Sequence, residues 1–240
     1  MSLVYLLEFN YSNNVVAEYL AVFVLQVLLY FVAGASVSLF YKICSKLGVG
    51  SRIELRPNYA GQIGSEIRWA LGACIIIAAY FYASFSFVES VYPPNWKVGG
   101  LQVLLFVVVY DFYMYVTHRA LHSRYLRKFH ARHHTAVSAT TWSCINLHPV
   151  ETLINYLPFL VFAVYIPVSL SVLLGIHIYM IVGIANGHSN YRLVPLESAP
   201  SLLNELTLFH QKHHSDGRGN FGYLLTHWDW LLGTRHQSPF

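Results

Sequence analysis

The chain has 240 residues, of which 55% are apolar and only 11% are charged. An ordinary soluble domain carries about 25% charged residues, so this composition excludes a typical water-soluble enzyme, a disordered segment and a nucleic-acid-binding protein. The net charge is +4, and the 13 histidines outnumber the 11 aspartates and glutamates. A chain this apolar with more histidines than carboxylates indicates a protein that binds metal ions or transfers protons.

Apolar stretches long enough to cross a bilayer recur along the chain, because a spanning helix needs about 20 mostly apolar residues. The first three predicted spans cover residues 15–41, 69–88 and 98–117. We interpret the whole chain, residues 1–240, as a single membrane domain whose fold class is all-α, a helical bundle of about four spans.

The fourth stretch, residues 152–186, is too long for one straight span. As a single helix it would reach about 52 Å, whereas the hydrocarbon core is about 30 Å thick. Pro158 and Pro167 interrupt it. We therefore expect a helical hairpin with one arm to about residue 166 and the other over residues 168–186.

The basic residues orient these spans through the positive-inside rule. Of the 15 basic residues, only Lys97 lies in the loop between the second and third spans. The other 14 lie on the opposite face: Lys42, Lys46, Arg52, Arg56, Arg68, Arg119, Arg124, Arg127, Lys128, Arg132, Arg192, Lys212, Arg218 and Arg235. We expect that face to be cytoplasmic and the N-terminus to be outside or lumenal, with the C-terminus cytoplasmic.

Three histidine clusters lie on the predicted cytoplasmic face. They are HxxxH at His118 and His122, HxxHH at His130, His133 and His134, and a second HxxHH at His210, His213 and His214. On a helix, positions i, i+3 and i+4 share one face, so HxxxH offers two imidazoles to one point and HxxHH offers three. Surface histidines facing lipid headgroups would not need this spacing. The pattern therefore predicts a metal site in a cytosolic cap formed by residues 118–150 and 188–240.

Two further histidines lie at the same membrane face, His148 in NLHPVE and His188 in ANGHSN. A single histidine of this kind is more often hydrogen-bonded than ligating, but beside the clusters we favour ligation for both. The eight clustered histidines exceed the four ligands of a closed structural zinc site and suit two metals with open positions. Imidazole binds zinc, copper, iron and nickel, and zinc can replace ferrous iron in a purified sample.

The segments HRALH, HARHH, HPVE, NGHSN, HQKHH and THWDWLLGT together resemble the fatty acid hydroxylase / sterol desaturase superfamily of membrane di-iron oxygenases. The resemblance runs from about residue 110 to residue 234. It implies a four-span helical fold with a histidine-lined cap, two iron ions, O₂ as oxidant and a lipid substrate. It also implies ten metal ligands: His118, His122, His130, His133, His134, His148, His188, His210, His213 and His214.

Asp111 is an acid inside a predicted span, which is costly and marks a functional candidate. It shares a helix face with His118 and His122, so we predict that it lies behind the ligands or lines a channel, with an interhelical hydrogen bond as the alternative. Glu151, Asp216 and Asp229 are weaker candidates for contacts to the ligands. His177 lies on the face of His188 but about 16 Å deeper, which favours an interhelical hydrogen bond over a place in the lining of a substrate channel.

Three functions fit these patterns. The first is a lipid hydroxylase that inserts oxygen into an unactivated C–H bond of a fatty acyl, alkyl or sterol-like substrate. The second is a lipid or sterol desaturase on the same scaffold, and the third is a non-enzymatic metal-binding or transport protein. Transport requires ionisable residues across several spans, but the first two spans hold no charged residue beyond Glu18. No nucleotide or flavin motif is visible, so we expect an external cytochrome b5-like or ferredoxin-like electron donor with its reductase. The membrane would be the endoplasmic reticulum or the bacterial inner membrane.

Overall fold

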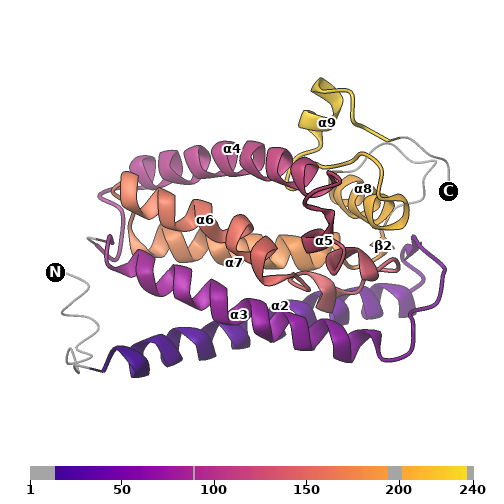
Figure 1. The fold of residues 1–240 in the computed structure, drawn as a ribbon, viewed down its shortest axis with the longest axis horizontal. Helices are drawn as coiled ribbons and strands as arrows, with labels where there is room; N and C mark the ends of the chain where they lie inside the picture. Colours follow the sequence, from indigo (N-terminus) through magenta and orange to yellow (C-terminus); the bar gives the residue numbers. More distant parts are fainter. Residues whose placement is uncertain (1–13, 89, 194–201, 237–240) are drawn as a thin grey trace.

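The computed structural model of the chain describes residues 14–88, 90–193 and 202–236. Long apolar helices run back and forth along one axis of the molecule (Figure 1). They are α2 (Val15–Lys46), α3 (Gln62–Phe85), α4 (Trp96–Leu121), α6 (Pro149–Tyr165) and α7 (Leu170–Gly187). Four of them, α2, α3, α4 and α7, are long and apolar enough to cross a membrane, and α6 is a shorter apolar helix. The all-α membrane bundle predicted from the sequence is confirmed.

The fourth apolar stretch forms the expected hairpin, in which α6 leads into α7. The break falls at Pro167, between the two helices. Pro158 does not interrupt the stretch, because α6 continues through it to Tyr165. That part of the prediction was wrong: neighbouring helices in a membrane bundle can accommodate a proline inside a helix.

The tip of this hairpin reaches the far end of the bundle, where α3 and α4 are joined. The backbone N–H groups of Leu170 and Ser171 donate to the carbonyl oxygens of Ser90 and Val91, both at 2.9 Å. The side chain of Gln102, from α4, donates to the Pro167 carbonyl at 2.6 Å. The hairpin therefore crosses the same depth as the spans beside it.

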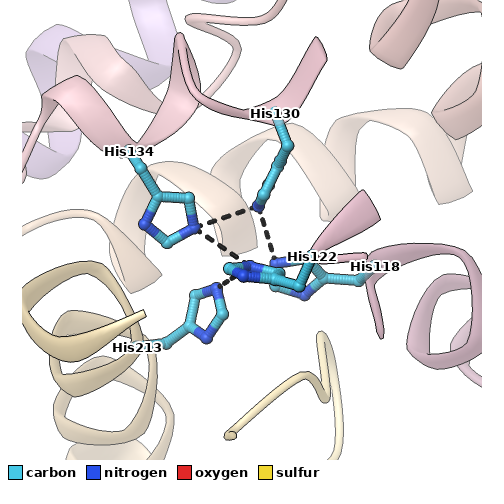
Figure 2. A group of neighbouring side chains, drawn as sticks. All are labelled: His118, His122, His130, His134 and His213. Atoms are coloured by element: carbon cyan, nitrogen blue, oxygen red, sulfur yellow. Dashed lines mark hydrogen bonds between the residues drawn. The ribbon is translucent and has the colours of Figure 1, made fainter. Parts of the chain in front are cut away.

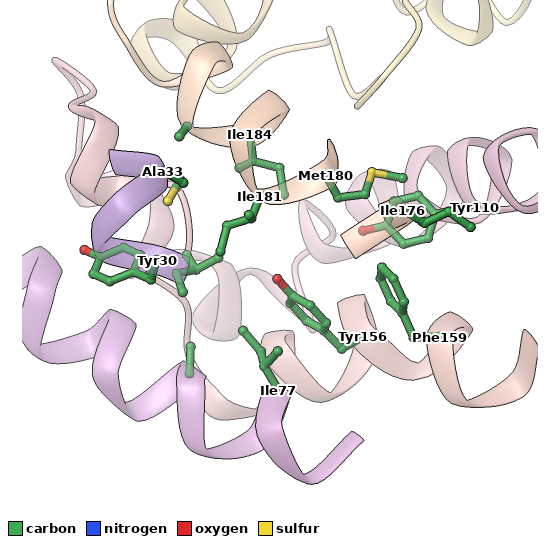
Figure 3. Close-up of a cluster of buried hydrophobic side chains, with 14 of the residues drawn as sticks. Tyr30, Ala33, Ile77, Tyr110, Tyr156, Phe159, Ile176, Met180, Ile181 and Ile184 are labelled. Atoms are coloured by element: carbon green, nitrogen blue, oxygen red, sulfur yellow. The ribbon is translucent and has the colours of Figure 1, made fainter. Parts of the chain in front are cut away.

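The core of the bundle is formed by aromatic and branched side chains from all five long helices (Figure 3). Phe159 of α6 lies at its centre, with ring centroids 5.3 Å from Phe81 and 4.8 Å from Phe106. His177 lies beside these rings, and its Nε2 is 2.7 Å from Oε1 of Gln26 on α2. This contact confirms the interhelical hydrogen bond predicted for His177.

The other end of the bundle carries the short elements. They are β1 (Ser51–Arg52), α5 (Arg127–His130), the 3-10 helices η1 (His133–Thr135) and η2 (Thr141–Ser143), β2 (Tyr191–Arg192), α8 (Leu202–Asp216) and α9 (His227–Leu231). Figure 1 shows α5 and α8 beside the end of α4. All three histidine clusters of the sequence therefore lie at one end of the molecule.

A two-stranded clip fastens the α2–α3 loop to the segment that follows α7. Strand β1 pairs antiparallel with β2. Gly50 precedes the clip at φ +79°, and a Cβ at this position would lie 2.1 Å from the Arg192 carbonyl oxygen. The side chain of Asn190 accepts from the backbone N–H of Glu54 at 2.7 Å and donates to its carbonyl at 3.0 Å. The clip thus fixes the chain immediately after His188.

Candidate metal centre

Nine of the ten histidines predicted as ligands gather into two groups, in which all rings are buried except the half-buried His122 and His134. The five-histidine group contains His118, His122, His130, His134 and His213, and the four-histidine group contains His133, His188, His210 and His214. Within each group, the candidate ligand nitrogens all lie within 4.8 Å of one another. Each group therefore has the size of a single metal site.

The five-histidine group joins three separate parts of the chain (Figure 2). His118 and His122 come from the last turn and the end of α4, where i, i+4 spacing points both rings the same way. The Nε2 atom of His134 lies 3.2 Å from that of His122 and 3.0 Å from that of His130. His213 of α8 completes the group, with its Nε2 3.0 Å from Nε2 of His122.

The four-histidine group is centred on His188, the C-cap residue that follows α7. Its Nε2 atom lies 3.3 Å from that of His133, 3.0 Å from that of His210 and 3.2 Å from that of His214. His188 is 1% exposed and His214 is 3% exposed. This group is thus as well shielded from water as the apolar core.

The three imidazoles of each HxxHH motif do not meet at one point, so this part of the prediction was wrong. In α8, His210 and His214 belong to one group and His213 to the other. The reason is geometric, because i and i+4 differ by about 40° around a helix whereas i+3 lies about 100° from i+4. The earlier motif is not one continuous helix, yet it also divides, with His133 separated from its neighbour His134.

The Nδ1 atoms of four ligand candidates face acceptors of the protein. Two of these acceptors are backbone carbonyls in the segment after α8: Phe221 O lies 2.9 Å from His118 Nδ1, and Gly219 O lies 2.7 Å from His213 Nδ1. The Ile184 carbonyl lies 2.8 Å from Nδ1 of His188. A neutral imidazole carries one N–H, so a ring that donates from Nδ1 turns a bare Nε2 lone pair towards its group.

Glu151, near the start of α6, supplies the fourth acceptor. Its Oε1 lies 2.7 Å from Nδ1 of His130, and the two side chains are 2% and 3% exposed. Its other oxygen, Oε2, is buried without a hydrogen-bond partner among the described residues. From its sequence position Glu151 was only a weak candidate, because its contact with His130 depends on how α5 packs against α6.

These contacts decide whether the groups suit a metal. His118 Nε2 and His130 Nε2 are 3.1 Å apart, and both rings donate from Nδ1 when the Glu151 carboxylate accepts. Two lone pairs facing each other at this distance repel, and a cation between them removes the repulsion. Carboxylates that hold a histidine in this way are typical of metal sites. The residues therefore fit a bound metal ion.

The burial of the groups keeps their rings neutral, as metal ligation requires. Burial lowers the pKa of His122 to about 4 and that of His134 to about 3. It lowers the pKa of His188 to about 4, and it lowers the pKa of His210 and that of His214 well below the ordinary range. At neutral pH the rings thus offer lone pairs and do not repel a cation by charge.

A small enclosed space of about 10 Å³ lies between the two groups. Its wall includes His118 and His130 from one group, and His133 and His210 from the other. A cavity of this size holds about one water molecule. The two groups thus line one common space with room for little more than a water molecule.

His148 lies outside both groups. It is the N-cap of α6, and its Nδ1 accepts a hydrogen bond from the backbone N–H of Val150 at 3.2 Å. Its ring stacks on Trp69, with centroids 6.3 Å apart. The local HPVE sequence suits this role, because a proline at the first helical position after a capping residue begins a helix.

Asp111 is 1% exposed and contacts a segment near the C-terminus. Among the described residues, no contact between Asp111 and a histidine of either group is found. Its Oδ1 accepts from the backbone N–H groups of Leu224 and Leu225 at 2.9 and 3.1 Å. The structure therefore places Asp111 where it fastens the segment that follows Phe221. The carbonyl of Phe221, just before this segment, in turn contacts His118.

Asp229, at 0% exposed, stabilises the same segment from within. It accepts from the backbone N–H groups of Phe221 and Gly222 at 2.8 and 2.6 Å and from Thr234 Oγ1 at 2.7 Å. Asp216 instead lies 3.3 Å from His236 at a half-exposed position. Asp229 thus holds the Phe221 carbonyl in place for His118, a role that the WDWLLGT sequence alone did not reveal.

The chain matches the fatty acid hydroxylase family over residues 103–234, which include every histidine of both groups. It is similar to methylsterol monooxygenase 2-1 of Arabidopsis thaliana, with 27% identity over 219 residues that cover 76% of this chain and 79% of the relative. It is also similar to the ornithine lipid hydroxylase OlsE of Rhizobium tropici, with 28% identity over 187 residues that cover 73% and 54% of the two chains.

A third relative is the lathosterol oxidase of Rattus norvegicus, with 28% identity over 151 residues that cover 62% of this chain and 50% of the relative. The chain thus spans about half the length of this oxidase and of OlsE. No solved structure matches the chain. The family match covers more than half of the sequence and agrees with the apolar helices and the buried histidines. The chain therefore belongs to the fatty acid hydroxylase family and is an integral membrane protein.

Proposed function

We propose that the protein is a membrane-bound, O₂-dependent lipid hydroxylase that holds two iron ions, one in each histidine group. The observation that carries this proposal is the pair of adjacent buried groups, of five and four histidines. When bound, iron would supply the activation of O₂ for attack on an unactivated C–H bond. Zinc can occupy the same imidazole sites in a purified sample.

The protein's own residues hold the ligand rings and exclude water. Glu151 and the Phe221 carbonyl fix the Nδ1 tautomer of His130 and His118, so that both Nε2 atoms stay turned inwards. Met114 and Leu121 line the small space between the groups beside these rings. A site with so little room for water strengthens electrostatic interactions within it and limits side reactions with water.

The relatives support a lipid substrate and an oxidation. They include a methylsterol monooxygenase, an ornithine lipid hydroxylase and a lathosterol oxidase. We propose a fatty acyl, alkyl or sterol-like substrate from the bilayer, and electrons from an external cytochrome b5-like or ferredoxin-like donor with its reductase. We also propose a lumenal or external N-terminus with the histidine groups and C-terminus on the cytoplasmic side, in the endoplasmic reticulum or the bacterial inner membrane. The distribution of basic residues supports this orientation.

The test is isotopic. Membranes containing the iron-loaded protein, a donor and its reductase receive ¹⁸O₂, and lipids are compared by mass spectrometry with those of a His118→Ala variant. Hydroxylation predicts an ¹⁸O-labelled hydroxyl that the variant lacks. Loss of two hydrogens without label would show a desaturase instead, and unchanged lipids with each donor would contradict an enzymatic role.

A further inference from the structure

A groove of about 610 Å³ lies between α2 and α7 and ends at the four-histidine group. Its α2 wall includes Ser36 and Phe40, and its α7 wall includes Tyr179 and Val182. The rings of His188 and His210 line the same groove. The volume lies in the range of small-molecule sites, about 300–1,000 Å³.

The lining of the groove is suited to hydrocarbon. None of the described residues that line it is Asp, Glu, Lys or Arg. Phe40 is 51% exposed, Tyr179 63% and Val182 40%, and all three belong to membrane-spanning helices. The groove therefore opens towards the acyl chains of the bilayer, where an exposed apolar wall is stable.

The α7 side of the groove follows one stripe of the helix. Tyr179, Gly183 and Gly187 are spaced four residues apart and extend about 12 Å along the axis. A Cβ at Gly183 would meet no heavy atom within 4 Å, and one at Gly187 would have only the His210 ring, at 3.9 Å. The two glycines thus leave a narrow open path that leads to His210.

We propose that this groove holds the extended hydrocarbon chain of a bilayer lipid, with the carbon to be oxidised at the end formed by His188 and His210. The assignment rests on the proposed function for its chemistry. A path along a single helix stripe fits an extended chain better than a broad, rigid ring system. The absence of charge among the described lining residues places a polar headgroup outside the groove.

The sharpest variant is Gly183→Phe, because a Cβ at this position meets no heavy atom within 4 Å and the added ring would occupy the groove. Gly72→Phe is the matched control. Gly72 is also an exposed glycine of a spanning helix, α3, where a Cβ would meet no heavy atom within 4 Å, and it does not line the groove. Both variants should insert and bind metal like the unaltered protein.

The measurement is photolabelling of the metal-loaded protein in nanodiscs by a phosphatidylcholine with a diazirine on its acyl chain. We expect labelled peptides to include Phe40 and residues 179–187, and Gly183→Phe to reduce this labelling by about fivefold or more while Gly72→Phe changes it by less than about twofold. Equal labelling of the Gly183→Phe variant would overturn the proposal. So would labelling of the groove by a diazirine sterol at least as strongly as by the acyl probe.

The two proposals fail in different ways. Because labelling needs no turnover, acyl labelling that depends on Gly183 in a protein that forms no oxidised lipid would support the groove and count against the hydroxylase. Product formed by the Gly183→Phe variant at the rate of the unaltered protein would refute the groove and leave the hydroxylase intact.

Discussion

Replacing Glu151 with glutamine tests how the five-histidine group is held. The Glu151 Oε1 to His130 Nδ1 distance is 2.7 Å, and both side chains are almost fully buried. Glutamine has the same shape and can still accept this hydrogen bond, but it carries no charge. A hydrogen bond to a charged group contributes about 1.5–3 kcal/mol, against about 0.5–1.5 kcal/mol for a neutral one. The substitution therefore weakens the hydrogen bond that holds the His130 ring by about 1–1.5 kcal/mol.

We expect the Glu151→Gln protein to bind metal about 10-fold more weakly, at the lower end of the 10–100-fold range for residues that support ligands. The metal-free Glu151→Gln protein should be at least as stable as the metal-free unaltered protein, because burying an amide costs less than burying a carboxylate. If Glu151 had only a structural role, its replacement would lower the stability of the metal-free protein. We instead expect weaker metal binding without that loss of stability.

The assay is metal retention against a graded chelator, measured by elemental analysis, together with the thermal midpoint of the metal-free protein. Glu66→Gln is the control. Glu66 is also a fully buried acid, but it accepts hydrogen bonds from Gln62 and Thr140, and no histidine partner is found for it among the described residues. Metal retention by Glu151→Gln equal to that of the Glu66→Gln control would refute the reasoning.

Three further predictions follow from the same contacts. His213→Ala should abolish lipid product and lower the metal content, whereas His236→Ala, at a half-exposed site that contacts Asp216, should change neither in mass-spectrometric and elemental assays. The metal-free protein should lose stability as the pH falls from about 6.5 towards 4. Burial lowers the pKa of His134 to about 3, so on acidification the unfolded chain binds protons at a higher pH than the folded protein does. Thermal midpoints measured across this pH range test this prediction. Gln26→Leu should lower the stability by about 1 kcal/mol, since it leaves His177 without its partner on α2, and denaturation in detergent measures this loss.

Each of these predictions has a result that would contradict it. Full product from His213→Ala would remove that residue from the ligands. A metal-free protein whose thermal midpoint rises on acidification would mean that the rings are charged in the folded state. Unchanged stability of Gln26→Leu would show that the hydrogen bond to His177 contributes nothing measurable.

Helix length and apolarity were readable from the sequence, because every backbone polar group in a bilayer must be satisfied within the chain. Residues 98–117 and 15–41 therefore matched α4 and α2 to within a few residues. The effect of Pro158 could not be predicted in this way. Whether a helix continues through a proline depends on the neighbouring helices, which the local sequence does not describe.

The histidine spacing predicted which residues gather but not how they divide. His133 and His134 are adjacent, and the chain between them and His130 is not one continuous helix, since α5 ends at His130 and η1 begins at His133. A face argument based on a regular helix fails there. His148 shows a related limit, because a capping nitrogen and a ligand nitrogen have the same sequence signature until the fold places them.

Residues that hold the ligands were the hardest to predict. Glu151 reaches His130 from another helix, and Asp229 acts through the carbonyl of Phe221. Such contacts join parts of the chain that are far apart in the sequence. Asp111 was predicted to lie behind the ligands or to line a channel, but it is buried and accepts hydrogen bonds from the backbone N–H groups of Leu224 and Leu225.

Metal counting on purified protein tests the central claim of two separate metal sites most directly. We predict two ions per unaltered chain, counting iron and zinc together, and one ion each in His118→Ala/His122→Ala and in His210→Ala/His214→Ala. Combining the four substitutions should leave none. One ion in the unaltered chain, or the loss of both ions from either double variant that remains folded, would contradict the account.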